Sequence, residues 1–259
     1  MKPAPRDTLD LPGAGREIPW SALLPSLDDR RRARLVHAWQ WRMEQEHLAV
    51  GVFCDLARDL AELGCEPVVL SLLTRAASDE VRHADICRRV AELHGAQDLP
   101  RGRRGAMPRP AFAGATFEQS VLYRVVETCC LSETFTVAYF TEMLEVATHP
   151  LGEAVVRSLL EDEVDHGRVG WAYLASARSR DGLAEMLPQL VNDTVAPVIK
   201  NAERAPEADD PELVPLGYLG TTRGADIYRR TLHDVILPGF DSVGVDTRAT
   251  RELVAARGW

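Results

Sequence analysis

The spacing Glu-x-x-His is the first sign of chemistry in this chain. It occurs three times, at Glu44/His47, Glu80/His83 and Glu163/His166. With 7 His in 259 residues, chance placement of the glutamates would give about half of one such match. Residues i and i+3 of a helix lie on one face, close enough to bind one ion together. A carboxylate and an imidazole at this spacing form a ligand pair suited to iron or manganese.

A dinuclear metal site needs more donors than one such pair. Two pairs on two helices, with one further glutamate from each of two other helices, supply four carboxylates and two imidazoles. That set holds two divalent ions near charge balance in the core of a helical bundle. The pairs at Glu80/His83 and Glu163/His166 lie in stripes of otherwise apolar or small residues, where ionisable groups are costly unless paired or bound to metal. We therefore expect these two pairs to form the centre of the site.

An aspartate precedes the glutamate of each of these two pairs. Asp79 and Asp162 can accept a hydrogen bond from an imidazole N–H, which would fix the orientation of the ring and raise the basicity of the ligand. Both are accordingly predicted to support the histidine ligands.

The two unpaired glutamates must be chosen from four. Glu44 and Glu46 lie about 200° apart on one predicted helix, so only one can face the core, and Glu127 and Glu133 lie about 240° apart on another. A gap-free shift of 83 residues pairs Glu44 with Glu127. We therefore predict Glu44 and Glu127 as ligands.

Two alternatives stay open. Positions 133 and 163 have their midpoint at 148, on the turn predicted between their helices, which favours Glu133 over Glu127. His47 is a candidate seventh ligand, but its repeat partner is Cys130.

The elements that must position these residues are helices. We expect four long ones, over about 28–63, 66–93, 116–147 and 148–179, with a long loop over 96–115. Gly64 is a typical helix stop, and Thr116 with Gln119 forms a capping-box pattern. Further helices are expected from Asp181 over about twenty residues, over about 222–234, and after Asp246.

An internal repeat supports two equivalent hairpins. The 83-residue shift places Pro67 on Pro150 and superimposes the Asp-Glu-Val motifs that begin at Asp79 and Asp162. The predicted fold is therefore all-α, a ferritin-like four-helix bundle of two helical hairpins with additional C-terminal helices. We expect an irregular arm over 1–26, the bundle with its dinuclear site over 27–180, and an extension packing on the bundle over 181–259.

Composition excludes several classes of protein. The net charge of −9 makes nucleic acid an unlikely partner, and no apolar run reaches about 18 residues, so no membrane span is expected. The N-terminal stretch is polar and proline-rich, without the apolar centre of a signal peptide, so a cytoplasmic location is expected. The five cysteines lack a CxxC pair and are expected to be reduced thiols.

These motifs resemble the ferritin-like di-iron carboxylate superfamily, of the oxygenase and oxidase type with two ExxH motifs, over roughly residues 28–179. The sequence Asp79–His83 reads DExRH, the motif of the hydroxylase subunits of bacterial multicomponent monooxygenases. The second motif has Asp165 where that pattern has arginine. In size the chain is closer to stand-alone enzymes such as p-aminobenzoate N-oxygenase-like proteins and tRNA-modifying di-iron hydroxylases.

The resemblance implies that the ligands are Glu44, Glu80, His83, Glu127, Glu163 and His166. It implies a non-haem di-iron oxidoreductase, a monooxygenase or oxidase that activates O2 or peroxide to oxidise a small organic substrate with an external electron donor. Its cofactor would be two iron ions (Fe2+/Fe3+), with manganese or a mixed pair as the alternative. A homodimer is compatible with this architecture. The alternatives are a ferroxidase or peroxide-scavenging metalloprotein without an organic substrate, and a bundle that serves only as an interaction scaffold.

Overall fold

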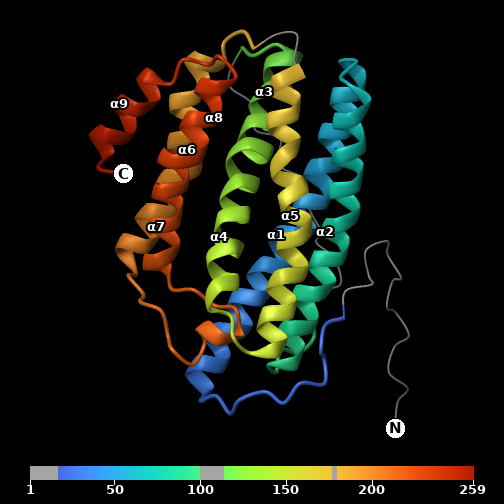
Figure 1. Ribbon diagram of the computed structural model, residues 1–259, viewed down its shortest axis with the longest axis vertical. Coiled ribbons are helices and arrows are strands. Elements are labelled where there is room, and N and C mark those ends of the chain that lie inside the picture. Colours follow the sequence, from blue (N-terminus) through green and yellow to red (C-terminus); the bar gives the residue numbers. More distant parts are fainter. Residues whose placement is uncertain (1–16, 100–113, 177–179) are drawn as a thin grey trace.

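The computed structural model describes residues 17–99, 114–176 and 180–259, and all regular elements in these ranges are helices (Figure 1). The predicted all-α class is thereby confirmed. Of the arm predicted over 1–26, the first sixteen residues lie outside the described ranges, as does most of the loop predicted over 96–115.

The first two helices form a hairpin. They are α1 (Asp29–Glu62) and α2 (Pro67–Leu93), close to the predicted bounds. Gly64 adopts φ +67° directly after α1, and the N–H of Cys65 bonds back to the carbonyl of Leu60 at 3.0 Å. This left-handed glycine ends the helix as predicted. Pro67 at the first position of α2 suits a site that needs no N–H donor.

The second pair of long helices contains an irregularity that the sequence pattern did not predict. A continuous helical rod comprises α3 (Phe117–Val125), a π-helical segment η1 (Val126–Ser132) and α4 (Glu133–Val146), and it is followed by α5 (Pro150–Ser176). The rod begins with the predicted capping box, in which Thr116 and Gln119 exchange hydrogen bonds. Because π-helical turns are wider than α-helical ones, η1 changes which side chains after it face inward.

The four rods lie side by side along the long axis of the molecule (Figure 1). Helix α2 packs against both α1 and α5, and α5 packs against α4 and η1. The Glu-x-x-His pairs on α2 and α5 therefore lie on neighbouring helices.

The C-terminal extension covers the α3–η1–α4 rod. It contains α6 (Leu183–Arg204), the short 3-10 turn η2 (Val214–Leu216), α7 (Thr221–Thr231), η3 (Leu232–Ile236), α8 (Leu237–Ser242) and α9 (Arg248–Arg257). Helix α6 contacts α3 and η1, and α7 contacts α4. The helix expected over 222–234 in fact continues to Ser242 through the π-helical segment η3, which ends two residues before Pro238. A proline cannot donate the regular backbone bond, and the wider turn accommodates it.

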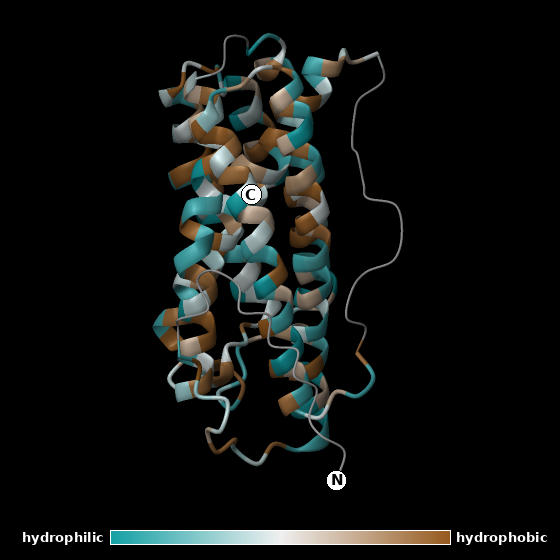
Figure 2. Cartoon of the chain, turned by 90° about the vertical axis from the view of Figure 1, so that its right-hand side faces the viewer, coloured by the Kyte–Doolittle hydropathy of each residue, from teal (hydrophilic) through white to brown (hydrophobic). Residues whose placement is uncertain are grey.

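Hydrophobic and hydrophilic residues are mixed along the helices (Figure 2). The buried hydrophobic residues form two clusters at different positions along the bundle. The Phe53 cluster includes Leu56, Val69 and residues of α6 and α9. The Trp39 cluster includes Met43, Ile86 and Phe140. Along α1, α2 and α5 the buried acidic and histidine side chains fall between these two clusters, apart from Asp59, which lies at the level of the Phe53 cluster and pairs with Arg124. The core therefore contains a polar layer enclosed by apolar packing.

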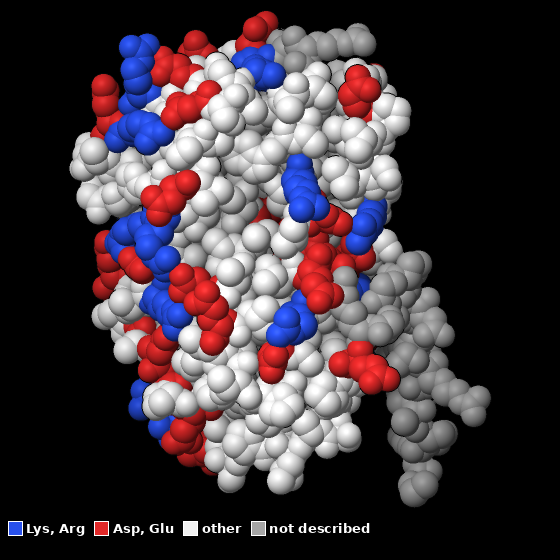
Figure 3. Space-filling view, in the orientation of Figure 1, with Lys and Arg blue, Asp and Glu red and all other residues white. Residues whose placement is uncertain are grey.

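On the face shown in Figure 3, acidic and basic side chains are interspersed over the helices around a largely uncharged centre. Among the described residues, no helix combines the length and the apolar character that crossing a membrane requires.

Candidate metal centre

Glu80, His83, Glu163 and His166 meet between α2 and α5. One potential ligand atom from each lies within 4.8 Å of the others, and all four residues are buried. Each histidine reaches the glutamate of the opposite helix: His83 Nδ1 lies 3.2 Å from Glu163, and His166 Nδ1 lies 3.1 Å from Glu80. The structure thus brings together the two predicted pairs in a cluster that could hold a metal ion.

The i, i+3 spacing accounts for the local geometry. His83 Nδ1 lies 3.3 Å from Glu80, and His166 Nδ1 lies 3.2 Å from Glu163, each within its own helix. The two imidazole centroids are 5.6 Å apart. In both rings Nδ1 faces the carboxylates, so Nε2 remains for a supporting contact.

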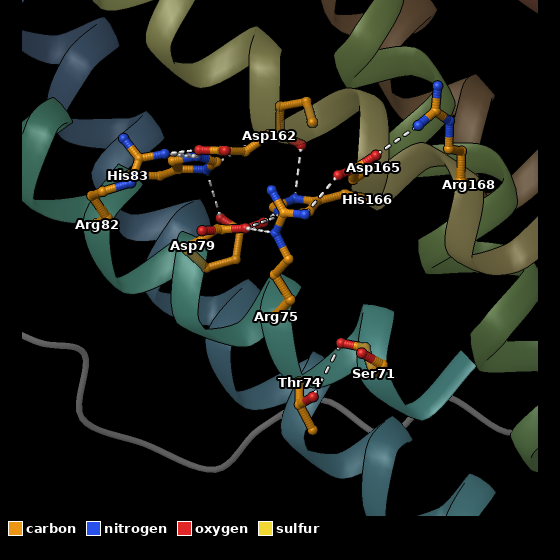
Figure 4. Close-up of polar contacts among 12 residues, drawn as sticks. Ser71, Thr74, Arg75, Asp79, Arg82, His83, Asp162, Asp165, His166 and Arg168 are labelled. Carbon is orange, nitrogen blue, oxygen red and sulfur yellow. Dashed lines mark hydrogen bonds and ion pairs between the residues drawn. The ribbon is translucent and has the colours of Figure 1, made fainter. Parts of the chain in front are cut away.

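The predicted supporting aspartates occupy that position, but each serves the opposite helix (Figure 4). Asp162 of α5 lies 3.1 Å from His83 Nε2, and Asp79 of α2 lies 3.6 Å from His166 Nε2. These crossed contacts fix both rings and connect the two helices on the outer side of the cluster.

The two aspartates have different cationic partners. Asp162 forms an ion pair with Arg82, which also donates to Ser158 at 3.0 Å in a buried setting. The second motif has Asp165 in place of an arginine, and Arg75 supplies the cation there (Figure 4). Arg75 lies 3.5 Å from Asp79 and 3.0 Å from Asp165, and its side chain is 56% exposed. The supporting network is therefore not identical around the two histidines.

On α1 the structure places the predicted ligand Glu44 outside the cluster. Glu44 is exposed, whereas Glu46 is buried, and the charge of Glu80 acts on Glu46. The two glutamates lie on opposite sides of one helix, and the side selected by the repeat register faces solvent. His47, the candidate seventh ligand, lies outside the four-residue cluster and is only half-buried. Burial and the nearby charge of Arg88 lower the pKa of His47.

On the α3–η1–α4 rod the predicted ligand Glu127 also lies outside the cluster, and the open alternative Glu133 lies next to it. Glu127 is half-buried, and burial and the charge of Asp193 on α6 raise its pKa. Glu133 is buried with its Oε2 3.9 Å from His166 Nδ1. Glu127 belongs to η1 and Glu133 is the first residue of α4, so the wider π-helical turns separate their directions, and the gap-free repeat register does not account for this rod.

The cluster concentrates more negative charge than the fold alone can neutralise. Burial and the charges of Glu80 and Glu163 raise the pKa of Glu46 well above its usual range, and the pKa of Glu133 is raised in the same way. Burial also opposes ionisation of Glu163, but contacts with His166 and His83 outweigh it and hold its pKa well below the usual range. Burial and mutual repulsion therefore favour the protonated forms of Glu46 and Glu133, whereas contacts with the two histidines favour the ionised forms of Glu80 and Glu163.

Several atoms at the centre have no hydrogen-bond partner. They are Glu80 Oε2, His83 Nδ1 and Glu163 Oε1, each sealed from solvent. Buried polar atoms are rarely left in this state without a ligand or ordered water. All three belong to the cluster and face its interior, as metal ligands would.

No protein-family model matches this chain, and neither a curated protein nor a solved structure matches it. The assignment of the centre therefore depends on its geometry alone.

Proposed function

We propose that the protein is a non-haem di-iron oxidoreductase with a ferritin-like bundle, which activates O2 or peroxide to oxidise a small organic substrate. The observation that carries the proposal is the crossed, buried arrangement of two Glu-x-x-His pairs on adjacent helices. Glu46 and Glu133, from the other two rods, complete a set of four carboxylates and two imidazoles.

The donors fit two divalent ions. The atoms of Glu80, His83 and Glu163 that lack a hydrogen bond would supply coordination positions, and two ions of charge +2 would balance four ionised carboxylates. The mixture of oxygen and nitrogen ligands suits iron, and manganese or a mixed pair fits the same donors. The raised pKa values of Glu46 and Glu133 show how strongly their ionisation depends on added positive charge.

Each group of the chain has a distinct task in this proposal. Bound iron would supply the electrons and the Lewis acidity that dioxygen chemistry requires. Glu80 and Glu163 each contact both histidines and would hold the ions together with them. Asp79 and Asp162 hold the imidazole rings, and the two apolar clusters exclude water from above and below the polar layer.

The C-terminal extension favours an organic substrate over iron alone. Tyr228 of α7 stacks on Phe135, two residues after Glu133, with a centroid distance of 4.3 Å. An aromatic side chain from outside the four rods thus packs next to the segment that carries a proposed ligand, where it could contact an organic substrate.

Metal stoichiometry is the direct test. The protein is loaded with Fe2+ without oxygen, and bound iron is counted after gel filtration. We expect two ions per chain in the wild type and in a Glu44→Ala/His47→Ala variant, which removes the third Glu-x-x-His pair. A Glu80→Ala/His83→Ala variant should lose this binding, and retention of both ions would contradict the proposal.

The reaction with oxygen separates the two activities. In the loaded protein, O2 uptake that is accelerated by an added organic compound, with formation of an oxidised product, supports the oxygenase. Sustained conversion of excess Fe2+ to ferric mineral, without a response to any organic compound, identifies a ferroxidase instead.

A further inference from the structure

Arg42 is a cation in an unusual position. It lies on α1 four residues before Glu46, which places the two side chains on the same face, one helical turn apart. Its guanidinium lies 4.5 Å from the ring centroid of Phe140, 5.4 Å from that of Tyr139 and 5.8 Å from that of Trp39. These aromatic rings hold the guanidinium beside the metal centre.

Glu46 is the acid nearest to the guanidinium on α1: burial raises the pKa of Glu46 and the charge of Arg42 opposes that rise, but the two side chains form no ion pair among the described residues. Within the described ranges, Arg42 forms neither an ion pair nor a hydrogen bond, although the chain has a net charge of −9. Other half-buried or buried arginines are paired: Arg34 with Asp210, Arg223 with Glu142 and Arg124 with Asp59. The nitrogens of Arg42 are also absent from the atoms sealed from solvent without a partner. Its donors are therefore accessible and unused.

Two tyrosines lie on this side of α1. Tyr139 of α4 contacts the guanidinium, and Tyr228 of α7 stacks on Phe135, which lies one turn before Tyr139 on the α3–η1–α4 rod, with a centroid distance of 4.3 Å. In the described part of the chain, neither hydroxyl has a hydrogen-bond partner. Burial raises the pKa of Tyr228 to about 12, so that its hydroxyl remains a donor. Three helices thus bring unused donors together.

We infer that Arg42, Tyr139 and Tyr228 bind the carboxylate of an organic acid, which is the substrate of the proposed di-iron centre. A guanidinium binds a carboxylate through two parallel N–H donors, and the tyrosine hydroxyls can donate to the same group. The surrounding rings offer apolar contact to the rest of the molecule. Since Arg42 is one turn from Glu46, a small acid held there would reach the metal ligands. The oxidation of this acid rests on the proposed function, whereas its binding by Arg42 and the two tyrosines does not.

Binding to the metal-free full-length protein tests the inference without a contribution from carboxylate binding to iron. Isothermal titration compares benzoate with benzamide, and hexanoate with hexanamide. At least one acid should bind 10-fold or more tightly than its amide. Arg42→Met keeps the apolar stem and should weaken binding of that acid by about 10- to 100-fold, whereas Arg42→Lys should restore part of it. Arg157→Met, which removes an exposed arginine paired only with Glu153, should bind like the wild type.

The outcomes separate this inference from the proposed function. No preference for an acid in either pair, or an unchanged preference in Arg42→Met with native helicity, would overturn the role of Arg42. Loss of stability in Arg42→Met without any change in acid affinity would assign it to packing alone. Iron stoichiometry is measured on the same variants, because two bound ions with no acid binding would refute only the inference. Acid binding without iron binding would refute the proposed function.

Discussion

At the scale of single residues, the metal centre is decided by which of two nearby glutamates faces the interior. Periodicity separates Glu44 from Glu46 and Glu127 from Glu133, but it does not say which member of each pair points inward. The gap-free repeat favoured Glu44 and Glu127, and the structure buries Glu46 and Glu133 instead. The midpoint of positions 133 and 163 at 148 was the better signal, since the turn after α4 lies at residues 147–149.

The prediction for α1 follows from burial. Glu46→Gln should remove one carboxylate from the metal centre and weaken iron binding, reducing the occupancy measured by titration under limiting Fe2+ by about 10-fold or more. Glu44→Gln, two residues away on the exposed side, should match the wild type. The same comparison applies to Glu133→Gln and Glu127→Gln. If Glu44→Gln weakens binding as much as Glu46→Gln, the assignment on α1 is wrong.

The crossed aspartates give a second prediction at this scale. Asp79→Asn should weaken metal binding by about 10- to 100-fold, because His166 loses the carboxylate that orients its ring. Folding should be little affected, since the cationic partner Arg75 is exposed. Asp165→Asn serves as the control, because Asp165 contacts Arg75 and Arg168 but no histidine. Equal metal affinities of the two variants, determined by competition with a chelator, would exclude the orienting role of Asp79.

At the scale of elements, most boundaries could be predicted from capping chemistry and periodicity. The helix ends depend on local backbone geometry, which can be predicted from single residues and short motifs: Gly64, Pro67 and the Thr116/Gln119 capping box. The π-helical segment could not be predicted, because Val126–Ser132 has the composition of an ordinary buried helix. Its existence depends on tertiary packing, above all on the close approach of α5.

Gly170 of α5 makes that close approach possible. A Cβ at this position would lie 2.5 Å from Cys130 Sγ and 2.8 Å from the backbone carbon of Cys129, both in η1. Gly170→Ala should therefore destabilise the protein by about 1–3 kcal/mol, against a gain in helix propensity of about 1 kcal/mol. Gly224→Ala on α7 meets only Tyr139 at 3.6 Å and should be neutral or stabilising. Urea unfolding gives the free energy of unfolding of both variants. Stabilisation by Gly170→Ala would show that η1 can shift freely.

The end of α2 contains a pH-sensitive group. Burial, with the nearby charges of His149 and Arg32, lowers the pKa of His94 from 6.5 to about 4. Between these values the unfolded chain takes up a proton that the folded chain does not, so stability should fall as the pH drops from about 6.5 to 4, by roughly 1.4 kcal/mol per unit at most. His94→Gln should remove this contribution to the pH dependence of the free energy of unfolding. Urea unfolding at pH 7.0, 5.5 and 4.5 compares the two proteins, and parallel pH profiles would refute the effect.

At the scale of the whole molecule, the polar layer is costly to the fold that holds it. Residues from α1, α2, α4 and α5 bring four carboxylates together between two apolar clusters, where they repel one another. The general plan of two hairpins was readable from the sequence because the same chemistry recurs on α2 and α5 with an 83-residue spacing. How α7 places Tyr228 beside α4 was not readable, because that contact joins segments nearly a hundred residues apart and has no local signal.

This arrangement predicts that metal ions stabilise the entire bundle. An ion that binds only the folded chain adds about 2.7 kcal/mol to the free energy of unfolding per site when its free concentration is 100 times the dissociation constant. Bound ions also relieve the repulsion among the carboxylates. Mn2+, which is stable in air, should therefore raise the midpoint of thermal unfolding by several degrees, and a chelator should reverse the shift. The Glu80→Ala/His83→Ala variant should show no shift, whereas Glu44→Ala/His47→Ala should respond like the wild type. An equal rise of the unfolding midpoint in both variants would mean that Mn2+ binds elsewhere. Apolar packing alone would then stabilise the four rods.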